Sequence, residues 1–406
     1  MSALLLAAGD PLLNETVKIF PIVAIVVVKV VVAFVFLMVA VMLMVWFERK
    51  LVAGMQNRIG PNVAGPFGIL QTLADGIKLF FKEDLIPDRS DPFVFKLAPY
   101  LSLVPAFLTF AVIPIGGGFA DGSDGTLSMF GHRTYLQLAD PPMGILLVLA
   151  MSSIAVYGVM LAGWSSGSKY PLIGSVRASA QMVSYEAALG LSVATVVLVS
   201  KTLSTHGIVV AQDSIGRWNI VATGVVPFVI FVIAATAELN RPPFDLVEAE
   251  QEIVGGYHTE YSSIRFALFY LAEFMNTVTM SAIIVTLFLG GPQSPFHWQP
   301  AGPAWLWGIF WFFLKLLVFL FMYIWFRATL PRLRYDQLMD LGWKVLIPLA
   351  FGWLLLIAAL KVARVENWNQ FLVVVISLAI AAAAWSLLSA ALRTAQRRRE
   401  LDGTSF

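Results

Sequence analysis

The sequence predicts an all-α integral membrane protein, a polytopic helical bundle of about nine transmembrane helices forming a single membrane domain over residues 1–406. Of its 406 residues, 59% are apolar and only 13% are charged. Average soluble domains carry about a quarter charged residues, and a soluble fold cannot bury so large an apolar fraction. A spanning helix needs about 20 mainly apolar residues. Nine segments reach that length: residues 19–46, 95–116, 142–164, 179–200, 219–237, 265–289, 304–326, 344–360 and 368–392.

Loop charges predict how these spans are oriented. Segment 19–46 has no basic leader and is too long for a signal peptide, so we expect it to span the membrane. The loops after the first, third, fifth and seventh spans, together with the tail at Arg397–Arg399, hold most of the basic residues. Since basic loops stay on the cytoplasmic side, we expect the N-terminus outside and the C-terminus inside. The Gly- and Asp-rich stretch 116–125 is then a flexible outer loop.

Composition excludes several classes of function. The formal net charge is +2 and no basic stripe appears, which argues against a nucleic-acid partner. There are no cysteines, so the chain cannot form disulfides, thiolate zinc sites or iron–sulfur ligation. The four histidines are scattered, which argues against a metal cluster. We therefore expect no metal and no cofactor bound by this chain.

The first inner loop, residues 47–94, is too long to be a simple connector. Its polar residues Gln71, Asp75, Lys78 and Lys82 repeat every three or four positions, and the apolar residues between them repeat with the same period half a turn away. This spacing predicts an amphipathic helix. Such a helix either anchors the chain to the membrane surface or covers a cavity.

The second inner loop, residues 238–264, has an excess of acids that topology does not explain. It carries a single base, Arg241. Like charges at Glu248 and Glu252 face each other on a helix, and carboxylates crowded in this way can hold and pass protons at neutral pH. The alternative is a solvated acidic loop, but interleaved apolar residues argue for partial burial. The six acids are Glu238, Asp245, Glu248, Glu250, Glu252 and Glu260.

Four charged residues lie deep inside predicted spans, well away from the ends of those spans. Glu186 and Glu273 are expected about 12–14 Å beneath the inner boundary, near the middle of a hydrocarbon core about 30 Å thick. Unpaired charges there are costly, so both acids should face the bundle interior or a water-filled cavity. Lys29 and Lys315 enter from the other side and either serve the same path or pair locally. These residues alone fit a proton or ion path, in a transporter as well as in an enzyme.

Four motifs then carry a resemblance that extends from about residue 18 to 360. They read ERKLVAGMQNRIGPNVAGPFG with QTLADGIKLFFKE (residues 48–83), YPLIGSVRASAQMVSYE (170–186), AELNRPPFDLVEAEQEIVGGYHTEY (237–261) and PRLRYDQLM (331–339). Their sequences and their order closely resemble those of the H subunits of bacterial NADH:quinone oxidoreductases (respiratory complex I). These membrane proteins correspond to subunit 1 of the mitochondrial enzyme.

The resemblance implies a membrane protein at the junction with the peripheral arm of that complex, in a bacterial cell membrane. Its inner loops would build a chamber for a lipophilic quinone, ubiquinone or menaquinone, that a partner's iron–sulfur cluster reduces. FMN and the other iron–sulfur clusters would belong to partner subunits. Acids of the chamber would couple quinone reduction to proton translocation in antiporter-like membrane-arm partners, within membrane lipid.

Where a motif matches, the roles of the family's residues can be assigned to the matching positions of this chain. The resemblance implies proton-coupling roles for a set of acids and one phenol: Asp75, Tyr185, Glu186, Glu238, Glu248, Glu250, Glu252 and Glu273. It implies a place at the quinone chamber or the partner interface for a second set: Arg49, Arg58, Lys78, Arg177, Arg241, Phe244, Asp245, Glu260, Arg332 and Arg334. Positive-inside charge explains Arg49, Arg332 and Arg334 equally well.

The chain also departs from the family pattern. The family commonly has eight spans, which match residues 18–360 here, whereas residues 361–406 add a ninth span and a basic tail. Three rivals remain: the related membrane protein of energy-converting hydrogenases, a free-standing ion transporter, and an anchor for a peripheral enzyme. Strong quinone-side motifs argue against the first, the long inner loops against the second, and the buried Glu186 and Glu273 against the third.

Overall fold

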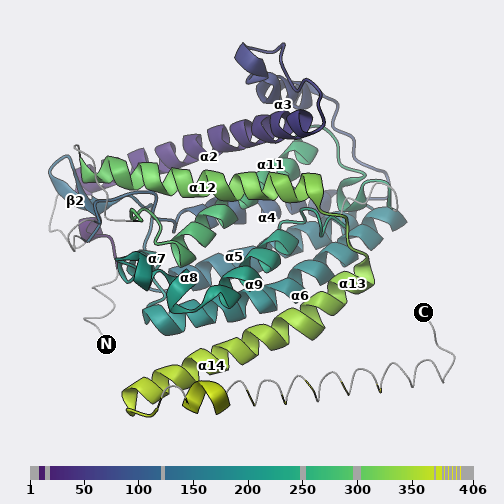
Figure 1. The fold of residues 1–406 in the computed structure, drawn as a ribbon. Helices are drawn as coiled ribbons and strands as arrows, with labels where there is room; N and C mark the ends of the chain where they lie inside the picture. The colour runs from purple at the N-terminus through teal and green to yellow at the C-terminus, as the bar shows by residue number, and fades with distance from the viewer. Residues whose placement is uncertain are drawn as a thin grey trace.

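The computed structural model describes residues 9–13, 19–119, 124–246, 253–295 and 303–369, with scattered residues between 372 and 394. The chain is mostly helical, and within the described residues seven helices are long and apolar enough to cross a membrane. The prediction of an all-α polytopic membrane protein is confirmed. The helices run side by side in one bundle, with a small hairpin at one end and α3 at the other (Figure 1).

Six of the seven candidate spans are single helices. Each of them overlaps a predicted span, and α2 continues well past the predicted end at residue 46, into the segment predicted as the first inner loop. The seventh, Tyr335–Val365, is built from α13 (Tyr335–Asp340), a π-helical turn (Leu341–Leu346) and α14 (Ile347–Val365). The six are α2 (Ile19–Met55), α4 (Pro92–Phe110), α5 (Gly144–Ser165), α6 (Lys169–Ser200), α11 (Ser263–Phe288) and α12 (Ala304–Thr329).

The predicted fifth span, 219–237, is not one continuous helix, and that prediction is wrong. It is divided into α8 (Asn219–Ala222) and α9 (Val225–Glu238). The break lies at Gly224, whose φ of 79° is left-handed, and the ring of Trp353 lies 2.9 Å from the place of a Cβ on this glycine. The 14 residues of α9 extend about 21 Å, less than the hydrocarbon core of about 30 Å. The predicted ninth span, 368–392, lies mostly outside the described residues.

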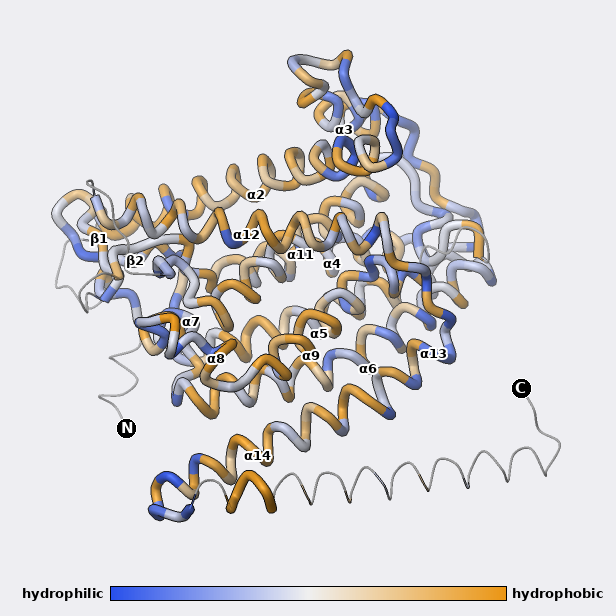
Figure 2. The backbone as a smooth tube through the Cα atoms, in the orientation of Figure 1, coloured by the Kyte–Doolittle hydropathy of each residue, from blue (hydrophilic) through white to orange (hydrophobic). Residues whose placement is uncertain are grey.

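α11 is the centre of the bundle. In its most apolar stretch 83% of the residues are buried, against 17% for α2 and for the Tyr335–Val365 segment. The central core contains large side chains of α9, α11 and α12, such as Phe231, Phe274 and Phe312. The outer helices α2 and α14 carry long stretches of apolar residues on the surface of the bundle (Figure 2), as expected of helices that meet lipid or other membrane subunits.

A small antiparallel hairpin lies at the end of the bundle where α2 begins. Strands β1 (Thr126–Met129) and β2 (His132–Tyr135) pair Thr126 with Tyr135. The sequence predicts a flexible loop over 116–125, and residues 120–123 of it lie outside the described part of the chain. Short helices complete this end and the loops: η1 (Pro11–Leu13), η2 (Pro66–Gly68), α7 (Thr205–Val210), η4 (Ile215–Arg217) and η5 (Gly256–His258).

The two lysines inside spans pair locally at this hairpin end. Lys29 forms a 2.7 Å ion pair with Asp10 and donates to the carbonyl of Gln137. Lys315 donates to the carbonyls of Leu289, Gly291 and Gln293 at 2.6, 2.9 and 2.7 Å. Those carbonyls follow the C-terminus of α11, where a cation is favoured. Of the two roles that the sequence left open for these lysines, the contacts favour local pairing.

Replacing Lys315 by methionine should therefore destabilise the protein without touching the acids of the bundle. Methionine preserves the length of the side chain but leaves three buried carbonyls without their donor, at a cost of about 1–3 kcal/mol for each buried group left unsatisfied. The measurement is the thermal unfolding temperature of the purified protein in detergent. Lys201→Met, at an exposed lysine, is the control and should unfold like the wild type; an unchanged Lys315→Met would contradict the assigned contact.

Candidate functional site

The predicted amphipathic helix in the first inner loop is confirmed as α3 (Gln71–Phe81), and no residue of it is buried. α3 lies across the ends of α2 and α11 (Figure 1). The three helices enclose a groove of about 880 Å³ with a mainly apolar lining. Side chains that line it include Val45 of α2, Ile77 and Lys78 of α3, and Ala267 and Tyr270 of α11.

A second, more polar groove of about 610 Å³ lies at the C-terminal ends of α2 and α12. Its lining includes Glu48, Arg49, Arg58 and Arg327. Arg49 lines both grooves and forms a 2.6 Å ion pair with Asp75 of α3. The apolar groove and the arginine-rich groove therefore adjoin each other at Arg49.

An ionic chain, in which Glu48 and Arg241 are buried, leads from the polar groove into the bundle. Arg327 pairs with one carboxylate oxygen of Glu48. Arg241 pairs with the other at 3.2 Å through Nη1, and with Glu273 of α11 at 3.1 Å through Nε. The guanidinium of Arg241 also lies 4.4 Å from the ring centre of Phe274. Two cations alternate with two anions, which is the arrangement that makes buried charges tolerable.

Backbone turns and one glutamine position Arg241. α9 ends at Glu238, and Asn240 takes a left-handed φ of 53° that reverses the chain. The amide of Gln181 on α6 donates to the carbonyls of Ala237 and Phe244, at 2.7 and 2.9 Å, and so holds both sides of the turn. The conformation that brings Arg241 toward α11 is thus fixed by α6.

Glu238 and Glu186 bind neighbouring serines of α5. Glu238, the last residue of α9, is 7% exposed and accepts a hydrogen bond from Ser152. Glu186 of α6 is half-buried and accepts one from Ser153. Because the two serines are adjacent on one helix, two acids from different helices meet at the same turn of α5. The sequence-based expectation that Glu186 and Glu273 face the bundle interior agrees with their positions.

Tyr185 and Arg177 make structural contacts. The hydroxyl of Tyr185 is fully buried and donates to the carbonyl of Leu338 in α13 at 2.9 Å. Its ring packs on Phe244, with the ring centres 5.4 Å apart. Arg177 lies over the ring of Tyr335, with its guanidinium carbon 5.5 Å from the centroid. These residues join α6 to the turn after α9 and to α13.

The remaining predicted site residues are spread along the same end of the bundle. Arg332 pairs with Asp245 at 3.1 Å, and Arg334 is exposed at the start of α13. Glu260 is half-buried beside Tyr261, whose hydroxyl donates to the carbonyl of Phe95. Burial raises the pKa of Tyr261 to about 12, so this phenol stays protonated at neutral pH. Glu248, Glu250 and Glu252 lie outside the described residues.

Sequence reasoning missed four residues that complete the site. Glu48 and Arg327 supply the groove end of the ionic chain, and Ser152 and Ser153 bind the two deepest acids. The sequence signal available for Arg327 was its position in the last turn of a span. The positive-inside rule explains a basic residue there equally well, so this signal did not identify Arg327 as a site residue. Nothing in the local sequence distinguishes Ser152 and Ser153 from serines that bind their own helix backbone.

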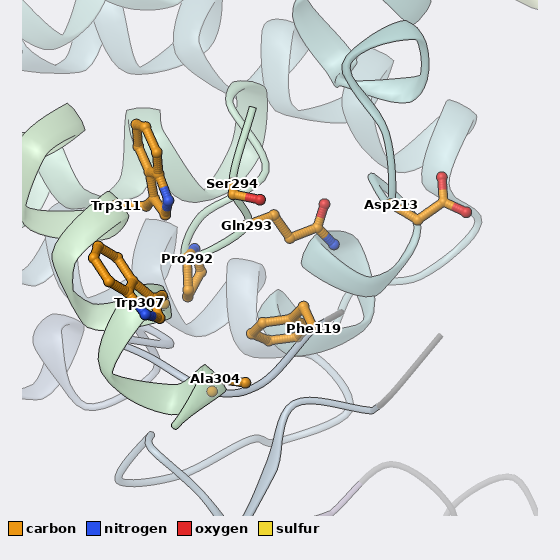
Figure 3. Close-up of a pocket in the computed structure, with 10 residues that line it drawn as sticks. Phe119, Asp213, Pro292, Gln293, Ser294, Ala304, Trp307 and Trp311 are labelled. Atoms are coloured by element: carbon orange, nitrogen blue, oxygen red, sulfur yellow. The ribbon is translucent and has the colours of Figure 1, made fainter. Parts of the chain in front are cut away.

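A much smaller cavity lies away from the two grooves. A cavity near the hairpin end is lined by Phe119, Gln293, Trp307 and Trp311 (Figure 3). Its volume of about 10 Å³ is roughly that of one water-sized probe. Within the described residues no three His, Asp or Glu side chains gather as a metal site.

Comparison with known proteins adds the family context. The family described as NADH dehydrogenase matches residues 28–358. A Streptomyces avermitilis protein, named as the H subunit of NADH-quinone oxidoreductase, is 52% identical over 348 residues, covering 85% of this chain and 75% of the relative. A Frankia alni protein of the same name is 55% identical over 342 residues, covering 82% of this chain and 72% of the relative.

Proposed function

The chain belongs to the NADH dehydrogenase family, as a subunit of the NADH-quinone oxidoreductase complex, and we propose that it receives quinone from the membrane and couples quinone reduction to proton translocation. The observation that carries this proposal is the continuity between two grooves and a line of buried charges. The apolar groove meets the arginine-rich groove at Arg49, and Glu48 of that groove begins the ionic chain to Glu273.

The two grooves suit the two parts of a lipophilic quinone. The apolar groove under α3 opens between α2 and α11 at the level of exposed apolar residues, where an isoprenoid tail could leave the lipid. The polar groove offers Arg49, Arg58 and Arg327 to the oxygen atoms of the ring. Ubiquinone and menaquinone share both parts, so the proposal is a lipophilic quinone of either kind.

Charge balance supplies the coupling step. Reduction of quinone to quinol takes up two electrons and two protons. Negative charge added in a poorly solvated groove is costly until protons or cations compensate it. Protons drawn toward the groove would alter the net charge of the chain formed by Glu48, Arg241 and Glu273. Because neighbouring carboxylates titrate as a coupled group, this change of charge would also affect Glu238 and Glu186.

Electrons must come from partner subunits, because this chain contains no cysteine for an iron–sulfur cluster. We propose that peripheral-arm subunits carrying FMN and iron–sulfur clusters dock at the α3 end, and that antiporter-like subunits adjoin the bundle in the membrane. The N-terminus would be outside a bacterial plasma membrane and the tail inside. The name shared by the relatives favours this enzyme over a hydrogenase-type complex or a free-standing transporter.

Filling the apolar groove tests this proposal. Ala267→Trp places a large ring in the groove, so the KM for quinone in the assembled complex should rise about tenfold, the effect of losing roughly 1.4 kcal/mol of binding. The measurement is NADH:quinone reductase activity at varied concentrations of a long-chain quinone. Val31→Trp adds the same ring on the exposed face of α2 and should leave the KM unchanged. Equal KM values for both variants and the wild type would exclude the groove as the quinone path.

A further inference from the structure

We propose that Lys201, Lys361 and Arg364 bind the phosphate of one anionic phospholipid at the end of the bundle away from α3. The ligand class is a lipid with a negatively charged phosphodiester headgroup, such as phosphatidylglycerol. This site is separate from the two grooves of the proposed quinone path, which lie at the opposite end of the bundle (Figure 1). The convergence of the cations, the absence of an acid paired with them and an apolar strip beside them support the proposal.

The three cations converge where α6 and α14 end. Lys201 directly follows the last residue of α6 and takes a left-handed φ of 61°. From α14, the ammonium of Lys361 donates to the carbonyls of Leu198 and Val199, so it holds the two helix ends together. Arg364 lies three residues after Lys361, on the same side of α14. Side chains from two separate spans therefore bring their positive charges to one place.

The described residues do not neutralise these charges. Lys201 and Arg364 are exposed, and both repel Lys361. Among the residues that the structure describes, no acid forms an ion pair with any of the three, and Glu366, which follows α14, is itself exposed. The orientation proposed above places this end outside, where the positive-inside rule does not call for basic residues. A bound anion would relieve the repulsion, and the ammonium of Lys361 has a third donor to offer it.

An apolar strip on α14 suits the acyl chains of a lipid. Phe351, Leu355 and Val362 are each at least half exposed, and their spacings of four and seven residues place them on one face of the helix. Lys361 lies at the end of this strip, next to Val362. Trp368, three residues beyond α14, is exposed, and tryptophan is enriched where headgroups meet the hydrocarbon core. The cations therefore lie at headgroup level, with apolar surface beneath them.

The combination of cations and apolar strip favours a phospholipid over a free phosphate ion. A phosphate ion would contact the three cations alone, whereas an anionic phospholipid contacts the cations with its headgroup and the strip with its acyl chains. Basic pockets between spanning helices bind anionic headgroups in this way, and each basic residue near such a surface strengthens binding roughly fivefold.

Photocrosslinking of the whole complex tests the proposal. The complex is placed in phosphatidylcholine nanodiscs that contain a trace of photoactivatable phosphatidylglycerol, and labelled peptides of this chain are identified by mass spectrometry. Phosphatidylglycerol should label residues 351–365 roughly tenfold more strongly than photoactivatable phosphatidylcholine does. Replacing Lys201 and Arg364 together by glutamine should lower that labelling about tenfold or more, because two of the three charges are lost.

Two matched controls accompany the double variant, which leaves Lys361 in place and so keeps the contact between α6 and α14. Lys201→Arg combined with Arg364→Lys preserves both charges and should be labelled like the wild type. Arg217→Gln removes an exposed charge that is paired with Asp213 at the same end of the bundle, and it should also be labelled like the wild type.

Each outcome supports or overturns the lipid site. Equal labelling by the two lipids, or wild-type labelling of the double variant, would overturn it. Labelling that is lost in inorganic phosphate, but not in sodium chloride of equal ionic strength, would assign the cations to free phosphate and overturn the lipid as ligand. NADH:ferricyanide activity checks assembly. If the double variant does not assemble, Arg364→Gln decides: labelling about fivefold below that of Arg217→Gln supports the site, and equal labelling rejects it.

Discussion

Arg241→Met is expected to destabilise the protein by about 3–5 kcal/mol, the cost of breaking a buried ion pair by removing one partner. Arg241 bridges Glu48 and Glu273, and its side chain is 7% exposed. Methionine fills a similar space but leaves Glu273 without its cation and Glu48 with Arg327 alone. Arg241→Lys keeps the charge but cannot reach two carboxylates with a planar fork, so we expect an intermediate loss. The measurement is thermal unfolding of the purified protein in detergent.

The matched control for Arg241 is an exposed arginine in an ion pair. Arg217 contacts Asp213 at 2.7 Å, with 70% of its side chain exposed. Exposed pairs contribute about 0.2–1 kcal/mol, so Arg217→Met should unfold close to the wild type. Equal unfolding temperatures for Arg241→Met and Arg217→Met would mean that the ionic chain does not hold the site together.

Glu238→Gln should lower NADH:quinone turnover of the assembled complex at least tenfold. A positioned acid or base typically contributes a factor of roughly 10²–10⁴. Glutamine keeps the shape of the side chain and can still accept a hydrogen bond from Ser152, but it cannot take up a proton. Electron transfer to ferricyanide in the partner subunits should continue, because it does not require this chain's acids. Parallel assays with quinone and ferricyanide measure the difference.

Glu366→Gln serves as the control for Glu238→Gln. Glu366 follows α14, is exposed, and lies at the end of the bundle away from α3. The same change of charge there should leave both activities at the wild-type level. Wild-type quinone turnover in Glu238→Gln would remove Glu238 from the coupling path.

The spans and α3 were predictable because each depends on periodicity within one segment. The amphipathic helix from residue 71 follows from polar and apolar positions half a turn apart, and α3 ends at Phe81, within one residue of the last polar position. The break in the fifth span was not predictable in this way. Gly224 is one glycine in an apolar run, and the ring of Trp353 that closes over it comes from α14, more than 100 residues later.

The candidate site also contains some residues that were predictable from the local sequence and others that were not. Glu186 and Glu273 were predictable because an acid within a span has few stable places other than the bundle interior. Their partners were not predictable, because Ser153 and Arg241 come from other segments that meet these acids only in the folded bundle. For Lys315, the charge was visible in the sequence, but the three carbonyls that bind it depend on the turn after α11.

The most direct measurement of the central claim is the number of protons translocated per NADH oxidised, recorded in the same proteoliposomes for the wild-type complex and for Glu238→Gln. If Glu238 lies on the coupling path, the turnover remaining in Glu238→Gln carries fewer protons per NADH, while Glu366→Gln keeps the wild-type ratio. A wild-type ratio in Glu238→Gln would contradict the account, because quinone reduction and proton translocation would then be coupled by a path that does not pass through this acid.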